Sequence, residues 1–331
     1  MVTISDVAER AQASTATVSR VLNGVATVSP VLAERVLTAA KDLGYQRNGL
    51  ARSLRRQATA VIALIISDVE NRFFTSIARG VEDAAQVEGY SVVLCNSDED
   101  ADKERRYLDV AVQERVAGVI ISPTAAEGNV DVLRDRGIPV VAVDRPLPGF
   151  NSDRVLVDTR AAAHEATAHL AAQGYRRIGL VTGPSGIPTA DDRLAGYLDG
   201  LRTAGLRAGQ RLVRRAPYRL SGGKAAVGEL FALAEPPDAL LIANSIMAIG
   251  ALEALSSLNL RSGRDVGVVA FDDAPWATLL DPPLSVVAQP AYDIGGAAAR
   301  LLLARIADNG RAPITTTLSA ALIPRASSTR G

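Results

Sequence analysis

From residue 61 onward the chain alternates short apolar runs with amphipathic stretches, and this pattern constrains the fold more than any other feature. The runs are rich in Val and Ile, as in "VIALII" at 61–66 and "DVGVVAF" at 265–271. The others lie at 91–95, 116–122, 138–143, 176–182 and 239–243. Between them, stretches such as 73–90 place apolar residues at helical spacing. Continuous β-branched runs separated by helices indicate parallel strands buried on both faces, which predicts a doubly wound α/β body.

Two parallel sheets fit this series better than one, because the first β/α series closes near Asp144 and a second begins after "RVLVDTR". The series begins after residue 60, so we predict a separate N-terminal part at 1–46, a connecting segment at 47–60 and the α/β body at 61–331.

Charge is distributed unevenly along the 331 residues. The whole chain carries 36 basic and 36 acidic residues, whereas residues 1–60 carry eight basic against four acidic ones, a net charge of +4. A basic segment on an acidic body suggests a polyanionic partner for the first sixty residues. The single cysteine, the acidic N-terminus without a signal-like apolar segment and the absence of a membrane-length apolar run lead us to expect a cytoplasmic protein.

The segment "ISDVAERAQASTATVSRVLNG" at 4–24 predicts two short helices joined by a turn after Ala11. Thr3 can cap the first helix, and a third helix begins with Ser29 as cap and Pro30 at its first position. Three short helices in this order predict a helix-turn-helix unit. The second helix is unusually rich in small hydroxyl side chains, which suits the major groove of DNA better than a solvent-facing surface.

Several motifs together resemble the LacI-type bacterial transcription repressors. They are "TISDVAERA", "TVSRVLNG", "NGLARSLR", "NRFFTSIARGVEDAA", "DDRLAGY", "NSIMAIGALEAL" and "FDDAPWATLLDPPLSVVAQP", and they extend over essentially the whole chain. Under this resemblance, residues 61–331 form a periplasmic-binding-protein-like body that binds a small effector and mediates dimerisation. Its expected lobes are an N-lobe of about 61–158 plus 290–318 and a C-lobe of about 159–289 plus 319–328. The resemblance implies a helix-turn-helix DNA-binding domain at 1–46 and a hinge helix and linker at 47–60. It also implies a homodimer that represses transcription by binding a pseudo-palindromic double-stranded DNA operator.

The same resemblance implies which residues contact DNA. In the second helix, Thr15, Ala16 and Arg20 occupy base-reading positions, and Thr17 and Ser19 are placed toward phosphates. Asn23 caps that helix or contacts a phosphate. In the hinge segment "NGLARSLRRQ" the implied DNA contacts are Ala51, Arg52, Leu54 and Arg55. Leu54 corresponds to the family's minor-groove wedge, and Arg47 replaces the proline that usually precedes this hinge.

A second set of residues, most of which follow predicted strands, has planar polar heads and aromatic rings. These residues are Asn71, Phe73, Phe74, Asp144, Arg145, Arg193, Tyr218, Asn244, Asp272 and Gln289. Such heads suit a polyhydroxylated ligand, because each hydroxyl both donates and accepts hydrogen bonds. The set resembles the pocket of the bacterial periplasmic ribose-binding proteins, with Tyr218 in place of a Phe. The resemblance implies ribose as effector, with a ribonucleoside or another pentose as the alternative.

Other classes of function remain as competing hypotheses. A sugar-binding transport protein would lack the N-terminal module, and an enzyme acting on a sugar or nucleoside would need a nucleophile or metal set that the sequence does not display. His164 and His169 are five residues apart and so lie off one helical face, and no Cys or acid completes a metal set with them, so no metal site, catalytic residue or cofactor is expected. "SGGK" at 221–224 lacks phosphate-loop spacing, and Cys95 is expected to be inert core.

Overall fold

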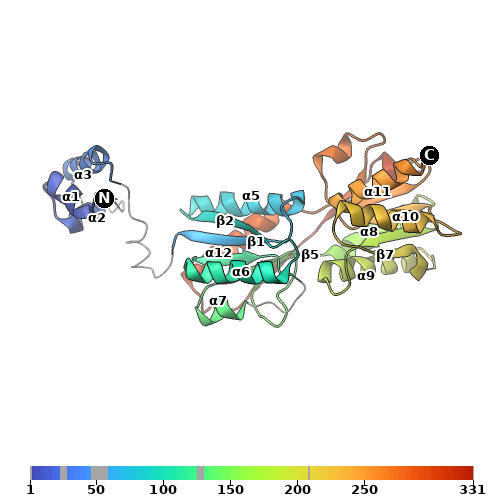
Figure 1. Cartoon of the computed structure of the whole chain (residues 1–331), viewed down its shortest axis with the longest axis horizontal. Helices are drawn as coiled ribbons and strands as arrows, with labels where there is room; N and C mark the ends of the chain where they lie inside the picture. The colour runs from blue at the N-terminus through green and yellow to red at the C-terminus, as the bar shows by residue number, and fades with distance from the viewer. Residues whose placement is uncertain (1, 23–27, 46–58, 125–129, 208, 331) are drawn as a thin grey trace. The chain divides into compact units, whose positions relative to one another are not determined.

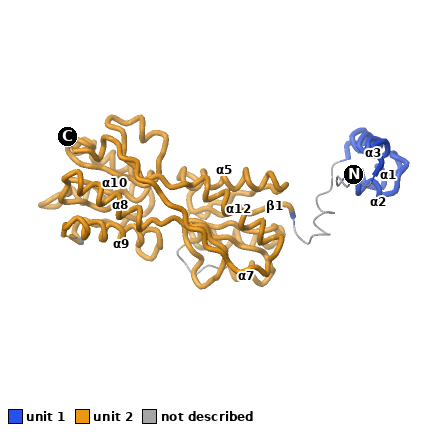
Figure 2. Tube along the Cα trace, turned by 180° about the vertical axis from the view of Figure 1, so that it is seen from behind, with its two compact units in different colours: residues 1–59 blue, residues 60–331 orange. Residues whose placement is uncertain are grey.

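The computed structural model describes residues 2–22, 28–45, 59–124, 130–207 and 209–330. The chain forms two compact units, residues 1–59 and 60–331, which Figure 2 draws in different colours. The segment 46–58, which contains most of the hinge predicted at 47–60, and the predicted cap Asn23 lie outside the described residues.

The first unit contains the predicted helix-turn-helix. Its described helices are α1 (Ile4–Arg10), α2 (Thr15–Leu22) and α3 (Pro30–Asp42). Thr3 caps α1 as predicted and forms a reciprocal capping box with Asp6. Val7, Val18 and Val36, one from each helix, are fully buried and form the centre of a small apolar core. The second helix is therefore held by packing, which leaves its opposite face available for a partner.

The second unit begins with a parallel sheet of six described strands in the order β11-β5-β4-β3-β1-β2. These strands are β1 (Val61–Ile66), β2 (Ser91–Asn96), β3 (Gly118–Ile121), β4 (Val140–Val143), β5 (Asp153–Val157) and β11 (Thr315–Leu318). Its helices are α5 (Arg72–Val87), α6 (Ala101–Gln113), α7 (Asp131–Asp135) and α12 (Ala291–Ala307). Helices α5 and α12 cover one face and α6 and α7 the other (Figure 1).

A second sheet, again of six described strands, has the order β12-β10-β9-β8-β6-β7. These strands are β6 (Ile178–Thr182), β7 (Val213–Arg215), β8 (Ala239–Ile242), β9 (Gly267–Phe271), β10 (Ser285–Ala288) and β12 (Ala321–Ile323). Strand β12 pairs antiparallel with β10, and the other pairings are parallel. The two sheets confirm the predicted doubly wound α/β body.

Helices cover both faces of this second sheet as well. They are α8 (Thr159–Ala172), α9 (Pro188–Thr203), α10 (Leu220–Phe231) and α11 (Ser245–Ser257), with short 3-10 turns η1 (Gln210–Leu212), η2 (Pro275–Thr278) and η3 (Ala326–Ser328). The "SGGK" motif lies inside α10, where a Cβ at Gly223 would come within 2.2 Å of the carbonyl oxygen of Met247. That glycine permits close packing of α10 on α11, a structural role that fits its lack of phosphate-loop spacing.

The prediction that every apolar run is buried on both faces was wrong for strand β2. This strand lies at the edge of its sheet, and Val93 and Leu94, which point to opposite faces, are 51% and 44% exposed. Cys95, predicted to be buried core, is only half-buried. An edge strand has one neighbour in the sheet, so its apolar side chains receive less cover than those of central strands.

The chain passes between the two sheets along described segments that follow β5, β10 and β11. Carboxyl ends of strands from both sheets meet at this junction, because residues that follow β1, β4, β8 and β9 line one shared cavity. This edge is where open parallel sheets bind ligands. We refer to the part built on the first sheet as the N-lobe and the part built on the second as the C-lobe.

Candidate functional site

The exposed face of α2 is a candidate nucleic-acid interface. Thr15, Ala16 and Arg20 are exposed, and Thr17 and Ser19 are partly buried. Ser14 accepts a hydrogen bond of 3.0 Å from the backbone N–H of Thr17 and so caps the start of the helix. Small side chains and one guanidinium on this face can approach base edges closely.

Arg35 of α3 holds the turn that precedes α2. Its Nη2 donates hydrogen bonds to the carbonyl oxygens of Ala11, at 2.5 Å, and Gln12, at 3.4 Å. Gln12 has a left-handed backbone conformation with φ of 48°, which tightens this turn. The angle between α1 and α2 therefore depends on a contact from the third helix, which sequence reasoning did not identify.

The predicted hinge contacts lie in the segment 46–58, which is outside the described residues: Ala51, Arg52, Leu54 and Arg55. The predicted cap Asn23 lies in a second such segment, 23–27. Their roles stay predictions.

A cavity of about 440 Å³ lies between the N-lobe and the C-lobe. All ten residues predicted to bind the effector line it. They come from seven places along the chain between Asn71 and Gln289, so only the fold brings them together. The volume falls in the range of roughly 300–1,000 Å³ that is typical of small-molecule sites.

On the N-lobe side, the start of α5 supplies an amide and two rings. Asn71 caps the helix by accepting a hydrogen bond of 3.0 Å from the backbone N–H of Phe73. The cap occupies its Oδ1, which leaves the amide N–H groups for a ligand. Phe73 and Phe74 meet edge to face with ring centroids 5.1 Å apart and provide an apolar wall.

The end of β4 supplies a carboxylate and a guanidinium. Asp144 has φ of 66°, a left-handed conformation that turns its side chain into the cavity. Arg145 donates through Nε to Asp144 at 3.1 Å and through Nη1 and Nη2 to Glu99 at 2.9 and 2.6 Å. Burial raises the pKa of Asp144, and the charges of Arg145 and Arg193 oppose that shift.

On the C-lobe side, Asp272 follows β9 and also has a left-handed backbone, with φ of 73°. Gln289 lies in the crossover segment after β10, and its Nε2 donates a hydrogen bond of 2.7 Å to Asp272 Oδ1. Burial raises the pKa of Asp272, and the charge of Arg193 and the bond from Gln289 oppose that shift. The carboxylate is thus oriented before any ligand binds.

Arg193 and Asn244 complete this side. The guanidinium carbon of Arg193 lies 4.4 Å from the ring centroid of Phe271, so the cation stacks on an aromatic face. Asn244 caps α11 by accepting a hydrogen bond of 2.8 Å from the backbone N–H of Met247. As with Asn71, its amide N–H groups remain for a ligand.

Three polar atoms of the cavity residues are buried and have no hydrogen-bond partner among the described residues. They are Arg193 Nε, Tyr218 Oη and Gln289 Oε1. Buried polar groups in folded proteins are nearly always paired, because leaving one unpaired costs about 1–3 kcal/mol. Three such atoms around one cavity indicate that a polar ligand belongs there.

Tyr218 occupies a position shaped by a glycine. A Cβ added to Gly183, which follows β6, would lie 2.2 Å from the Cζ of the Tyr218 ring. Any larger residue at Gly183 would therefore displace the ring. Burial raises the pKa of the Tyr218 hydroxyl, so this group remains protonated at neutral pH and can donate a hydrogen bond.

Among the described residues, no group of three His, Cys, Asp or Glu side chains is arranged to hold a metal ion. Each histidine instead forms a hydrogen bond with a hydroxyl group. His164 Nε2 lies 3.2 Å from the hydroxyl oxygen of Thr203, and His169 Nε2 lies 2.7 Å from that of Ser328. No helix within the described ranges is long and apolar enough to cross a membrane.

Comparisons with known proteins identify the family. A ribose operon repressor from Halalkalibacterium halodurans is 37% identical over 306 residues, covering 92% of this chain and 91% of that protein. The profile of "Bacterial regulatory proteins, lacI family" matches residues 3–48, and that of the periplasmic binding protein-like domain matches 167–328. This chain belongs to the lacI family.

Solved structures of lacI-type regulators match nearly the whole chain. The lac repressor dimer bound to operator and the anti-inducer ONPF is 25% identical with a TM-score of 0.86, covering 99% of both chains. The transcriptional regulator CelR in complex with cellobiose is 31% identical with a TM-score of 0.75, covering 99% of this chain and 100% of that one. The lacI family thus accounts for both the helix-turn-helix and the two-lobed body.

Sequence reasoning missed several residues of the lacI-type cavity. The polar ones among them are Asp68, Asp98, Glu99, Thr124, Ser185, Thr189 and Arg219. Asp68 and Asp98 lie two residues after the ends of β1 and β2, so the same position-after-strand argument that identified Asp144 would have included them. Arg219, adjacent to Tyr218, follows no predicted strand, so that argument would not have identified it.

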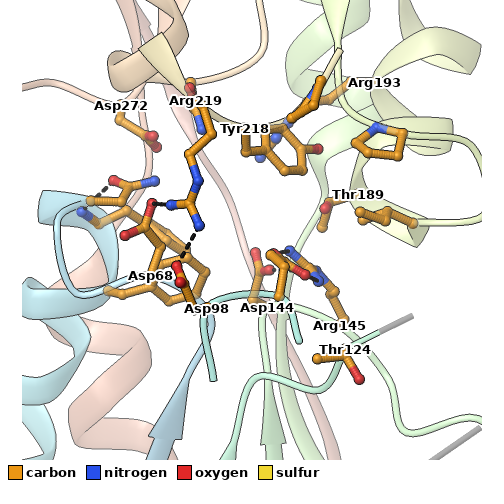
Figure 3. Close-up of a pocket in the computed structure, with 18 of the residues that line it drawn as sticks. Asp68, Asp98, Thr124, Asp144, Arg145, Thr189, Arg193, Tyr218, Arg219 and Asp272 are labelled. Carbon is orange, nitrogen blue, oxygen red and sulfur yellow. Dashed lines mark hydrogen bonds and ion pairs between the residues drawn. The ribbon is translucent and has the colours of Figure 1, made fainter. Parts of the chain in front are cut away.

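Arg219 joins the two lobes at the cavity. From its position before α10 in the C-lobe it forms ion pairs with Asp68, at 3.2 Å, and with Asp98 of the N-lobe (Figure 3). Its side chain is 38% exposed, whereas that of Asp68 is 10% exposed. The bridge therefore lies at the rim of the cavity, where solvent screens part of its strength.

Proposed function

We propose that this lacI-family chain is a transcriptional repressor whose operator affinity is set by ribose bound between the N-lobe and the C-lobe. One observation carries the proposal: ten residues chosen from sequence as a ribose-type set all line a single cavity. The 37% identity to a ribose operon repressor over 92% of the chain supports the same effector.

The chemistry of the cavity suits a sugar ring. The carboxylates of Asp144 and Asp272 accept hydrogen bonds from hydroxyls, and the amides of Asn71 and Asn244 donate them. The unpaired Oε1 of Gln289 adds an acceptor. The rings of Phe73 and Phe74 lie where the apolar face of a pentose can pack against them. A site with polar groups placed for hydroxyls rejects analogues that lack them.

For DNA we propose the contacts predicted from the sequence. Thr15, Ala16 and Arg20 read base edges, Thr17 and Ser19 contact phosphates, and the hinge inserts Leu54 into the minor groove. Arg52 and Arg55 beside it neutralise phosphates. The protein would then act on the bacterial nucleoid.

We propose a homodimer, because one recognition helix reads too few base pairs for genomic specificity. The edge strand β2 offers a surface for the second copy, since Val93 and Leu94 are exposed there, as is Val110 of α6. The solved lac repressor relative is itself a dimer on its operator. Two copies related by a twofold axis match a pseudo-palindromic site.

The switch follows from the position of the cavity. Ribose contacts both lobes, so it favours one degree of lobe closure over another, and closure changes the spacing of the paired hinge segments at 47–60. A hundredfold change in operator affinity corresponds to about 2.7 kcal/mol of coupling. A few hydrogen bonds to buried charged groups, at about 1.5–3 kcal/mol each, can supply that amount.

Calorimetry on the full-length protein with ribose, adenosine and uridine tests the effector. We expect heat of binding with ribose. If a nucleoside binds and alters operator affinity while ribose does neither, the pentose assignment is wrong and the nucleoside alternative takes its place. Analysis of the same mixtures for reaction products tests the enzyme alternative, and any turnover of the sugar or nucleoside would support it.

A further inference from the structure

The cavity carries more negative than positive charge. Among the described residues that line it are five carboxylates and three guanidinium groups, a formal net charge of −2: Asp68, Asp98, Glu99, Asp144 and Asp272 against Arg145, Arg193 and Arg219. An anionic group of a ligand would need a cation that is not already paired with a carboxylate. The pairing of these three arginines therefore decides which ligands the cavity admits.

Arg145 is already neutralised by two carboxylates. It forms a bidentate pair with Glu99 through Nη1 and Nη2, while Nε donates to Asp144. A further bond of 3.2 Å runs from Nη1 to the carbonyl oxygen of Pro123. The side chain is only 3% exposed, so this geometry is held by packing as well as by charge.

Arg219 is also paired twice, and its partners lie in the other lobe. Asp68 and Asp98 both accept from its guanidinium. Asp98 and Glu99 have left-handed backbones, with φ of 59° and 58°, and they direct neighbouring carboxylates to different arginines. The loop after β2 thus binds one cation on each side, Arg145 through Glu99 and Arg219 through Asp98.

Arg193 is the remaining cation, and it is compensated at longer range. It is 5% exposed and stacked on Phe271. Its charge acts on the carboxylates of both Asp144 and Asp272, since it lowers the pKa of each against the effect of burial. A phosphate placed beside Arg193 would therefore also face these two acids.

We infer that the cavity takes an uncharged sugar and excludes its phosphorylated form, and that Asp98 contributes to this selectivity by keeping Arg219 paired. The inference rests on the proposed function. A phosphate monoester adds about two negative charges to a cavity that already has an excess of two. Placing like charges together in a cavity that excludes most of the solvent weakens binding. We expect ribose 5-phosphate to bind at least about a hundredfold more weakly than ribose.

Calorimetry on the full-length protein with ribose and ribose 5-phosphate measures this ratio. A parallel pair, adenosine and adenosine 5′-monophosphate, applies the same test if the effector is a nucleoside. Weaker binding of the phosphorylated member by about a hundredfold supports the inference. Binding of ribose 5-phosphate within tenfold of ribose overturns it but leaves a sugar-controlled repressor in place. If no member of either pair binds, the proposed function fails together with the inference.

Two matched variants test the role of Asp98. Asp98→Asn removes one negative charge and one of the two partners of Arg219. We therefore expect ribose 5-phosphate to bind this variant more tightly, which lowers the ratio of the ribose affinity to the ribose 5-phosphate affinity by about tenfold. Asp102→Asn is the control, because Asp102 lies outside the cavity on α6, where it pairs with Arg105 at 2.6 Å. We expect the wild-type ratio in the control. An equal ratio in the two variants would refute the assigned role of Asp98.

Discussion

Gln289 donates a hydrogen bond of 2.7 Å to the carboxylate of Asp272. This bond connects the crossover segment after β10 to the end of β9. The bond orients Asp272 within a cavity where the charge of Arg193 lowers the pKa of this carboxyl group against the effect of burial. Asp272 is partly buried and lines the cavity, and the groups that face its carboxylate depend on its charge. Removal of one member of such a network leaves the others buried and unpaired.

Asp272→Ala is therefore expected to abolish the ribose response. We predict a loss of ribose affinity of at least a hundredfold, about 2.7 kcal/mol, while operator affinity without ribose stays at the wild-type value. Calorimetry and fluorescence anisotropy measure the two quantities. Asp273→Ala is the matched control, because Asp273 pairs with Arg325 at 2.9 Å and does not line the cavity. Loss of ribose binding in Asp273→Ala alone would contradict this assignment.

Ribose affinity should fall as the pH is lowered. Burial holds the pKa values of Asp144 and Asp272 above the ordinary value of 3.8, and hydroxyls that donate to these carboxylates favour the ionised form. Binding thus lowers both pKa values and releases protons. Between the bound and free pKa values, affinity increases with pH by up to about tenfold per unit for each proton released.

Calorimetry between about pH 5 and pH 7, in two buffers with different ionisation enthalpies, measures this proton release. Arg145, Arg193 and Glu99 act on the pKa of Asp144, whereas Arg193, Gln289 and Asp144 act on the pKa of Asp272. An affinity that stays constant over this range, with the same heat in both buffers, would show that neither carboxyl group changes protonation on binding.

Leu54→Ala should weaken binding to the operator much more than binding to random DNA, because a wedge contributes only where the duplex can be kinked. Arg52→Ala and Arg55→Ala should instead weaken binding to both DNAs and reduce the salt dependence, by about 0.9 in log–log slope for each lost phosphate contact. Anisotropy titrations at several salt concentrations separate the two effects. Equal losses on operator and random DNA for Leu54→Ala would argue against a wedge.

Leu94→Asp should convert the dimer into monomers. Leu94 is 44% exposed on the edge strand β2, so a carboxylate there is solvated in the monomer and desolvated in the proposed interface. Sedimentation velocity measures the change, and an unaltered circular dichroism spectrum shows that the lobe remains folded. A variant that stays dimeric at the wild-type dissociation constant would place the interface elsewhere.

Local sequence signals predicted the parts of the site that depend on strand ends. Asp144 and Asp272 were found because parallel strands present their carboxyl ends at one edge, and their positions in the fold agree with that argument. The caps formed by Thr3, Asn71 and Asn244 likewise depend on residues close in sequence. Such features need no knowledge of distant contacts.

Other features depend on contacts between distant segments and could not be predicted in this way. The bridge from Arg219 to Asp68 links residues 151 positions apart in different lobes. The exposure of β2 follows from its place at the sheet edge, which an apolar run does not reveal. The glycines of "SGGK" serve helix packing, which requires knowing that α10 lies against α11.

The most direct test of the account is the operator affinity of the full-length protein with and without saturating ribose. The operator is first selected from a random DNA library by the protein itself, and affinity is then measured by anisotropy. We predict a change of about a hundredfold with ribose and no change with ribose 5-phosphate at the same concentration. Operator affinity that is the same with and without ribose would contradict the central claim.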